Sequence, residues 1–322
     1  MFSRSDAQAL RARLPEIAFT NANADDADNA LLQAYRAHYG LDFEDLKVPI
    51  EHCIGTFSSG DYTLVGQYFG LSKDHEKGCA LLLHGYFDHA GLFSHLIRHC
   101  LEQGHSVLIF DFPGHGLSTG SEASIDSFLD YVDALQSYLR LARACGLQPR
   151  ALIGQSTGAA IVMDSLLNRP AELTGIEKRI LLCPLLFPVK WNSSSLLFYF
   201  LRLFTSSSPR RFAPNSHDEA FLNFLKTKDA LQSSVLPVSW VAAMIDYQRR
   251  FAASAVMPVP IEIIQGTGDE TVDWQRNLKL IGEKFPQATT QLIEGAKHHL
   301  VNESVPYREQ VFEKIAQILN SG

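Results

Sequence analysis

The sequence has no long hydrophobic run, no cluster of basic residues and no paired cysteine motif. No apolar stretch reaches the ~18 residues that a membrane-spanning helix needs. The net charge is −7, and the longest basic runs are Arg210-Arg211 and Arg249-Arg250, so we expect no nucleic-acid partner. Met1–Leu14 alternates arginine with polar residues and lacks the apolar core of a signal peptide. We therefore expect a cytoplasmic protein.

The cysteines also argue against a metal or disulfide framework. They are odd in number and have no CxxC spacing. Each lies in or beside an apolar run, where a thiol acts as a small buried hydrophobe. We therefore expect buried, unpaired thiols at Cys53, Cys79, Cys100, Cys145 and Cys183.

The overall composition is that of a globular chain. Of 322 residues, 46% are hydrophobic and 20% are charged, and no repeat or low-complexity linker divides them. We predict one domain, residues 1–322, in which residues 1–45 form a polar, partly helical lead-in. Val48–Phe57 and Tyr62–Phe69 predict a β-hairpin, because Ser58–Asp61 between them has turn chemistry.

Short, continuous apolar runs then alternate with amphipathic helices. The clearest helix is Ser124–Ala142, which carries one apolar stripe. Uninterrupted apolar runs suit strands that are covered on both faces. Together with the hairpin, they predict an α/β fold with a mostly parallel, eight-stranded sheet covered by helices on both faces. The six runs are Cys79–Leu83, Ser106–Phe110, Arg150–Ile153, Arg179–Cys183, Ile261–Ile264 and Thr289–Ile293.

Residues 187–257 break this alternation, and they predict a helical cap inserted over the ligand end of the sheet. Its centre, Ser195–Phe204, is densely apolar and aromatic. The alternatives for this centre are an ordinary buried helix, a lid that faces substrate, and a helix that contacts lipid or a membrane surface.

The strongest local signal is Gly154-Gln155-Ser156-Thr157-Gly158, which fits G-x-S-x-G between a strand-like run and the opening of a helix. A tight strand-to-helix turn exposes the serine Oγ and leaves no room for a side chain on either glycine. The helix N-terminus adds positive potential for a developing oxyanion. We therefore predict that Ser156 is a nucleophile.

Such a serine needs a base, and the base needs an orienting acid. Asp269 follows the run Ile261–Ile264 and is the predicted acid, although a turn aspartate is the alternative and Asp273 is a rival. Asp273 resembles the start of the next helix. His298 follows the last strand-like run and is the predicted base, but spacing alone leaves the adjacent His299 open.

The oxyanion hole is predicted at the end of another strand-like run. His84-Gly85-Tyr86 follows the run Cys79–Leu83, so the backbone N–H groups of Tyr86 and Thr157 are the expected oxyanion donors. The alternative is a plain turn that ends the strand. His95 and His99 are four residues apart, but no HExxH glutamate lies between them, so we expect no zinc site.

Five motifs, taken in order, resemble the α/β-hydrolase family, and within it the branch of monoacylglycerol lipases and lysophospholipases. The resemblance spans about Val48 to the C-terminus and implies the acid at Asp269, the base at His298 and a helical cap at Phe187–Met257. That branch commonly has HGxGEH and GHSxG, whereas this chain has HGYFDH and a glutamine before the serine. The motifs are His84–Gly91, Asp111–Ser118, Gly154–Gly158, Gly266–Asp269 and Glu294–His298.

These features predict a serine hydrolase that cleaves a small acyl ester, such as a monoacylglycerol or lysophospholipid, through an acyl-enzyme. No metal or organic cofactor is required by this chemistry. The aromatic cap favours an apolar acyl group and allows contact with lipid. Two alternatives stay open: the same triad acting on a thioester, a lactone or a carbon–carbon bond, and a binding protein that kept the fold without catalysis.

Overall fold

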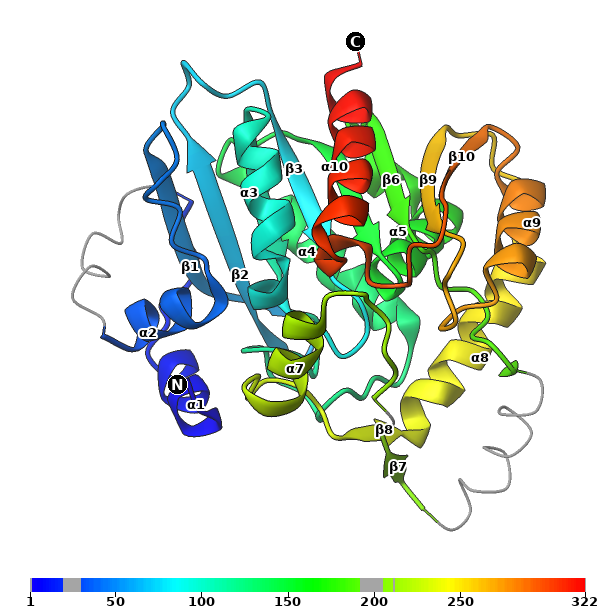
Figure 1. Ribbon diagram of the computed structural model, residues 1–322, viewed down its shortest axis with the longest axis horizontal. Helices are drawn as coiled ribbons and strands as arrows, with labels where there is room; N and C mark the ends of the chain where they lie inside the picture. Colours follow the sequence, from blue (N-terminus) through cyan, green and yellow to red (C-terminus); the bar gives the residue numbers. More distant parts are fainter. Residues whose placement is uncertain (1, 20–29, 192–204, 211, 322) are drawn as a thin grey trace.

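The computed structural model describes residues 2–19, 30–191, 205–210 and 212–321, and its centre is an eight-stranded sheet (Figure 1). The strand order is β1-β2-β4-β3-β5-β6-β9-β10. β1 and β2 pair with each other antiparallel, and β2 pairs antiparallel with β4, whereas all other neighbours are parallel. The predicted mostly parallel sheet is therefore confirmed.

The strands follow the predicted runs to within a few residues. They are β1 (Ile50–Ser59), β2 (Tyr62–Leu71), β3 (Gly78–Leu83), β4 (His105–Phe110), β5 (Pro149–Gln155), β6 (Lys178–Leu182), β9 (Ile261–Gly266) and β10 (Ala288–Ile293). A separate antiparallel pair, β7 (Ser207–Pro209) and β8 (Val235–Pro237), lies within the region where the cap is expected.

The helices alternate with the strands after β3. They are α1 (Arg4–Arg11), α2 (Ala30–Tyr39), α3 (Ser94–Glu102), α4 (Phe128–Ala144), α5 (Thr157–Asn168), α7 (Glu219–Thr227), α8 (Val238–Ala253), α9 (Trp274–Lys284) and α10 (Val305–Asn320). Short 3₁₀ turns are η2 (Ala90–Phe93), η3 (Pro170–Leu173) and η4 (Leu300–Asn302). In the described part of the chain, no helix combines the length and apolar character required to cross a membrane.

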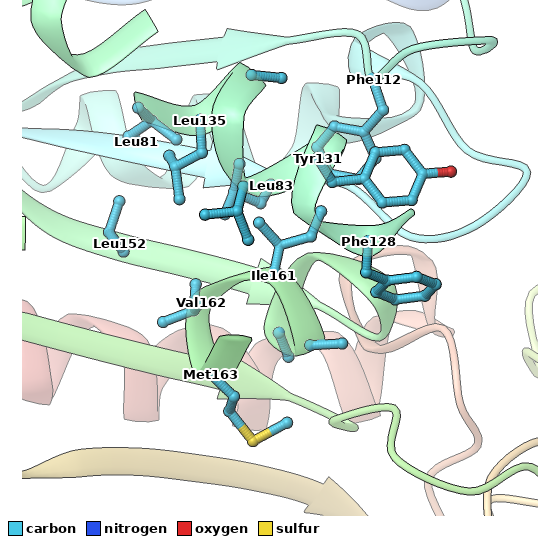
Figure 2. Packing of buried hydrophobic residues seen from close by; sticks show 14 of the residues in the cluster. Leu81, Leu83, Phe112, Phe128, Tyr131, Leu135, Leu152, Ile161, Val162 and Met163 are labelled. Carbon is cyan, nitrogen blue, oxygen red and sulfur yellow. The ribbon is translucent and has the colours of Figure 1, made fainter. Parts of the chain in front are cut away.

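Two hydrophobic cores cover the two faces of the sheet. Successive side chains of a strand point to opposite faces, so Leu81 and Leu83 of β3 enter one core and Ala80 and Leu82 the other. The first core contains side chains of α4, α5, α8 and α9, and the second contains those of α1, α2, α3 and α10. Figure 2 shows the first core, where side chains of β3, β5, α4 and α5 meet.

Three local details differ from the sequence expectations. α4 begins at Phe128 rather than Ser124, because the Ser127 hydroxyl caps the helix by accepting a 3.1 Å hydrogen bond from the Leu129 N–H. Residues 1–45, expected to be a polar lead-in, also contribute to the hydrophobic core, since α1 and α2 bury Leu10 and Tyr35 in the second core. Cys145 is exposed, contrary to expectation, because it follows the last turn of α4, whereas the other four free cysteines are buried.

In its described part, the region predicted as a cap contains α7, the β7–β8 pair and α8, and α8 packs into the first core. α8 buries Trp240, Met244 and Tyr247 in the first core, and the Tyr247 ring stacks on Phe128 of α4 at 4.9 Å. α7 and the β7–β8 pair precede it in sequence. The apolar centre of the prediction, Ser195–Phe204, lies outside the described residues.

Candidate active site

Ser156 lies on the sharp turn between β5 and α5. Its backbone has φ 54° and ψ −107°, in the left-handed half of the conformational map that residues with a Cβ rarely adopt. The turn is held by two backbone hydrogen bonds, from the Ser156 N–H to the Leu182 oxygen at 2.8 Å and from the Leu185 N–H to the Ser156 oxygen at 3.2 Å. Strain of this kind persists only where the surroundings determine it.

The two glycines of G-x-S-x-G allow this turn to pack closely. A Cβ on Gly154 would lie 2.5 Å from the backbone carbon of Gly158. A Cβ on Gly158 would lie 2.2 Å from the carbonyl oxygen of Leu83, at the end of β3. Both contacts are with backbone, which cannot move aside, so the steric reason for the motif is visible in the structure.

His298 lies between Ser156 and Asp269. Its Nε2 is 2.9 Å from Ser156 Oγ, and its Nδ1 is 2.7 Å from Asp269 Oδ2. All three residues are buried, which shields this chain of hydrogen bonds from bulk water. The structure therefore brings together the three residues predicted from the sequence, although they follow three different strands.

Asp269 is held in its ionised form by its surroundings. Burial alone would raise its pKa, but His298 and the N–H groups of Thr271 and Val272 lower it. Those two amides donate to Oδ1 at 2.8 and 3.1 Å, which leaves Oδ2 for the imidazole. The rival Asp273 caps α9 instead, accepting from the Arg276 N–H at 3.4 Å.

The second histidine of the pair points elsewhere. His299 Nε2 lies 3.1 Å from Asp88 Oδ2, and both side chains are buried beside the triad. Burial alone would raise the Asp88 pKa, but its contact with His299 and the nearby Arg210 guanidinium lower the pKa to about 2. Sequence reasoning did not find this second His–Asp pair, since neither residue lies at a position that the nucleophile motif defines.

The residues of the predicted oxyanion hole flank Ser156. Tyr86 lines the cavity that Ser156 also lines, and Thr157 is the first residue of α5. Within the described chain, neither of their backbone N–H groups donates to a protein acceptor, which leaves both for a ligand. Tyr86 is fixed by its side chain, since its ring stacks on Trp240 at 3.8 Å and its hydroxyl donates to the Ala123 oxygen at 2.6 Å.

Residues 85–88, which carry Tyr86 and form the predicted oxyanion loop, are supported by the buried side chain of His84. Its Nε2 accepts a hydrogen bond from the Phe112 N–H at 3.0 Å, so Nδ1 carries the proton and donates to the Gly85 oxygen at 2.7 Å. Burial, together with nearby His115, places the His84 pKa well below its usual value. The imidazole is therefore neutral and structural.

Gln155 links the serine turn to the histidine loop, a role that sequence reasoning missed. Its side-chain Nε2 donates to the backbone oxygen of His298 at 2.8 Å, in a fully buried position. The sequence signal for this role was the position of Gln155 directly before the serine, where monoacylglycerol lipases and lysophospholipases commonly have histidine. This bond ties the base to the element that carries the nucleophile.

Cys183, Asp269 and His298 offer ligand atoms that lie within 4.8 Å of one another. A metal ion there would need a thiolate, yet burial raises the pKa of Cys183 well above its usual value. It would also replace the hydrogen bond between Asp269 and His298. The donor set therefore fits a proton-relay triad better than a resident metal.

The triad opens into a cavity of about 190 Å³. Its apolar walls come from the oxyanion loop, the turn after β6, the region of α7 and α8, and Phe212. Its polar lining includes Ser156 and His298 of the triad, the second His–Asp pair and two cations, Arg210 and Lys226. Among the residues that line the cavity are Tyr86, Phe87, Asp88, Arg210, Phe212, Lys226, Trp240 and His299.

Comparisons with known proteins agree with the fold. The family model Hydrolase_4, described as "Serine aminopeptidase, S33", matches residues 74–305. Human monoglyceride lipase is 25% identical over 252 residues, which cover 74% of this chain and 81% of that protein. Phospholipase YtpA of Bacillus subtilis is 25% identical over 256 residues, covering 74% and 94%. In fold, a soluble variant of Saccharomyces cerevisiae monoglyceride lipase superposes with a TM-score of 0.72 at 18% identity, covering 85% of this chain and 96% of that one.

Proposed function

Because this chain belongs to the serine aminopeptidase family Hydrolase_4 and has the α/β-hydrolase fold, we propose that it is a serine hydrolase of carboxylic esters. The observation that carries the proposal is the continuous hydrogen-bond chain from Ser156 Oγ through His298 to Asp269. Fold alone would not suffice, since this architecture serves many functions.

In the proposed reaction, His298 Nε2 takes the proton of Ser156 Oγ as the oxygen attacks the ester carbonyl. Asp269 keeps the imidazole in the tautomer that accepts at Nε2 and stabilises the imidazolium that forms. The N–H groups of Tyr86 and Thr157 bind the tetrahedral oxyanion, and each such donor contributes about 3–4 kcal/mol. His298 then protonates the leaving alcohol.

The acyl-enzyme is resolved by water in the second half of the reaction. His298 removes a proton from the water, which attacks the acyl carbonyl, and the same oxyanion hole binds the second tetrahedral species. The acid departs as His298 returns the proton to Ser156 Oγ. Every step uses side chains and amides of this chain, so the proposed chemistry requires no cofactor.

The proposed substrates are monoacylglycerols, lysophospholipids or similar small acyl esters. Relatives that carry monoglyceride lipase and phospholipase names support this class. The cavity of about 190 Å³ lies below the ~300–1,000 Å³ of typical ligand pockets, so it suits the reacting ester with a small head group. Contact of residues 195–204 with an acyl chain or lipid surface stays a prediction.

The test is nucleophile replacement with a matched serine control. Ser156→Ala should lower p-nitrophenyl ester turnover by about 10⁶ and abolish labelling by a fluorophosphonate probe. Ser165→Ala removes a buried hydroxyl of α5 that has no hydrogen-bond partner among the described residues, and it should keep both signals. Near-normal turnover in Ser156→Ala would sink the proposed function.

A further inference from the structure

Arg210 places a partly buried cation in the cavity that contains Ser156. Its Nη1 is anchored by two acceptors, the side-chain oxygen of Gln232 and the backbone oxygen of Ser233, the latter at 3.2 Å. The rings of Phe87 and Phe212 lie 4.0 and 4.4 Å from the guanidinium carbon. The side chain is therefore held in one orientation rather than free in solvent.

The anchored guanidinium keeps one edge open. It has five N–H donors, of which Nη1 supplies the two that are used. Among the described residues, neither Nε nor Nη2 of Arg210 has a protein acceptor, and no carboxylate lies within 4.0 Å. An Nε–Nη2 edge of this kind matches the two oxygens of a carboxylate or phosphate.

The other charges of the cavity do not neutralise this cation directly. Asp88 lies in the same cavity but pairs with His299 at 3.1 Å. Lys226 of α7 adds a second, exposed cation, with no ion pair in the described part of the chain. Burial lowers the Arg210 pKa to about 10 even though Asp88 raises it, so the side chain stays charged at neutral pH.

The whole protein has a net charge of −7, so an excess of cations in this cavity is a local property. We propose that the ester substrate carries an oxyanion group, phosphate or carboxylate, that binds the open edge of Arg210 with Lys226 at the rim. This inference rests on the proposed ester hydrolase function and makes it narrower. It distinguishes an anionic ester from a neutral monoacylglycerol.

Matched substrate pairs, compared by their kcat/KM values, test the charge preference and its source. The phosphate pair is monodecanoylglycerol phosphate and neutral monodecanoylglycerol. The carboxylate pair is p-nitrophenyl hydrogen adipate and p-nitrophenyl hexanoate. We expect the anionic member of at least one pair to be favoured about 10- to 100-fold, the range of a hydrogen bond between charged groups. The favoured pair identifies the anion.

Substitutions test whether Arg210 causes the preference for anionic esters. Arg210→Gln should reduce that preference about 10-fold or more, and Arg210→Lys should restore part of it, because a lysine keeps the charge but not the bidentate edge. Lys279→Gln, on the exposed side of α9 and outside the cavity, makes the same charge change and should leave the preference intact. Fluorophosphonate labelling checks that each variant keeps a folded active site.

A ligand-competition experiment tests the site without a chosen ester. Inorganic phosphate should slow fluorophosphonate labelling of the wild-type serine, and it should slow labelling of Arg210→Gln much less. Neutral esters cleaved as well as anionic ones, with no protection by phosphate, would overturn the inference and leave the proposed function standing. Absence of both labelling and ester cleavage in the wild type would overturn both.

Discussion

Replacing Asp229 should destabilise the fold far more than replacing an exposed carboxylate. Its side chain joins three segments: it accepts from the Tyr39 hydroxyl at 2.9 Å, lies 3.1 Å from His89 Nε2 and accepts from the Leu231 N–H at 3.0 Å. The His89 and Asp229 side chains are both 0% exposed. Asp229→Ala therefore leaves three donors without their acceptor, two of them on the buried side chains of Tyr39 and His89.

The expected size follows from burial. Breaking a buried ion pair by removing one partner costs about 3–5 kcal/mol. For a chain of 322 residues, an unfolding entropy of about 2.1 cal/mol/K per residue converts this to a Tm decrease of about 4–7 °C. An exposed pair contributes about 0–1 kcal/mol, which corresponds to about 1.5 °C or less.

The effect should also depend on pH. Burial alone would lower the His89 pKa, but Asp229 raises it above its usual value, so the stability from His89 is present below about pH 6.5 and is lost as pH rises through the folded pKa. Burial alone would raise the Asp229 pKa, but His89 lowers it, so that contribution is present above about pH 3.9 and is lost as pH falls through the folded pKa. The difference between wild type and variant should be largest between about pH 4 and 6.5.

Thermal unfolding followed by circular dichroism at pH 5.5 and 9 checks both points. Glu177→Ala is the matched control, because Glu177 pairs with Arg150 at 3.1 Å while both side chains are more than half exposed. The reasoning is refuted if Asp229→Ala shifts Tm no more than the control, or if its shift is larger at pH 9 than at pH 5.5.

Three further predictions test the active site. His298→Ala should abolish ester turnover while His299→Ala retains a measurable rate, because only His298 reaches the serine; the reverse result in a steady-state assay would contradict the assignment. Gly158→Ala should destabilise the fold by about 1–3 kcal/mol through contact with Leu83, whereas Gly282→Ala, with open space around its Cβ, should be neutral or stabilising in chemical denaturation. Gln155→Met should lower kcat about 10-fold with little change in KM, and an unchanged kcat would show that its bond to the histidine loop is dispensable.

Much of the site could be predicted because it lies at strand ends. In a parallel sheet, the loops that follow successive strands meet at one edge, so a serine after β5, an aspartate after β9 and a histidine after β10 are brought together by topology. The glycine spacing around Ser156 carried the same information locally, since backbone contacts forbid any side chain there. These signals lie in short segments of the chain, so they can be recognised from the sequence alone.

Other features depend on contacts between distant segments, and the sequence could not separate them. His298 and His299 are neighbours of the same residue type, and only the path of the loop directs one to Ser156 and the other to Asp88. Likewise, the sequence pattern of an apolar helix is the same whether the helix covers a ligand or fills a core. The stacking of Tyr247 on Phe128 shows that α8 fills the first core, and the sequence could not show this. Tertiary context decides such cases.

The oxyanion loop is fastened to the chain that follows α7, and this constrains any attempt to alter specificity. The Gln232 side chain donates to the Phe87 oxygen at 2.7 Å, and Trp240 stacks on Tyr86. An engineer who grafted residues 205–240 from a relative in order to exchange substrates would thereby replace the supports of an amide proposed to act in every catalytic cycle. Substrate range and turnover should therefore evolve together in this protein, and libraries that retain Gln232 and Trp240 offer the better starting point.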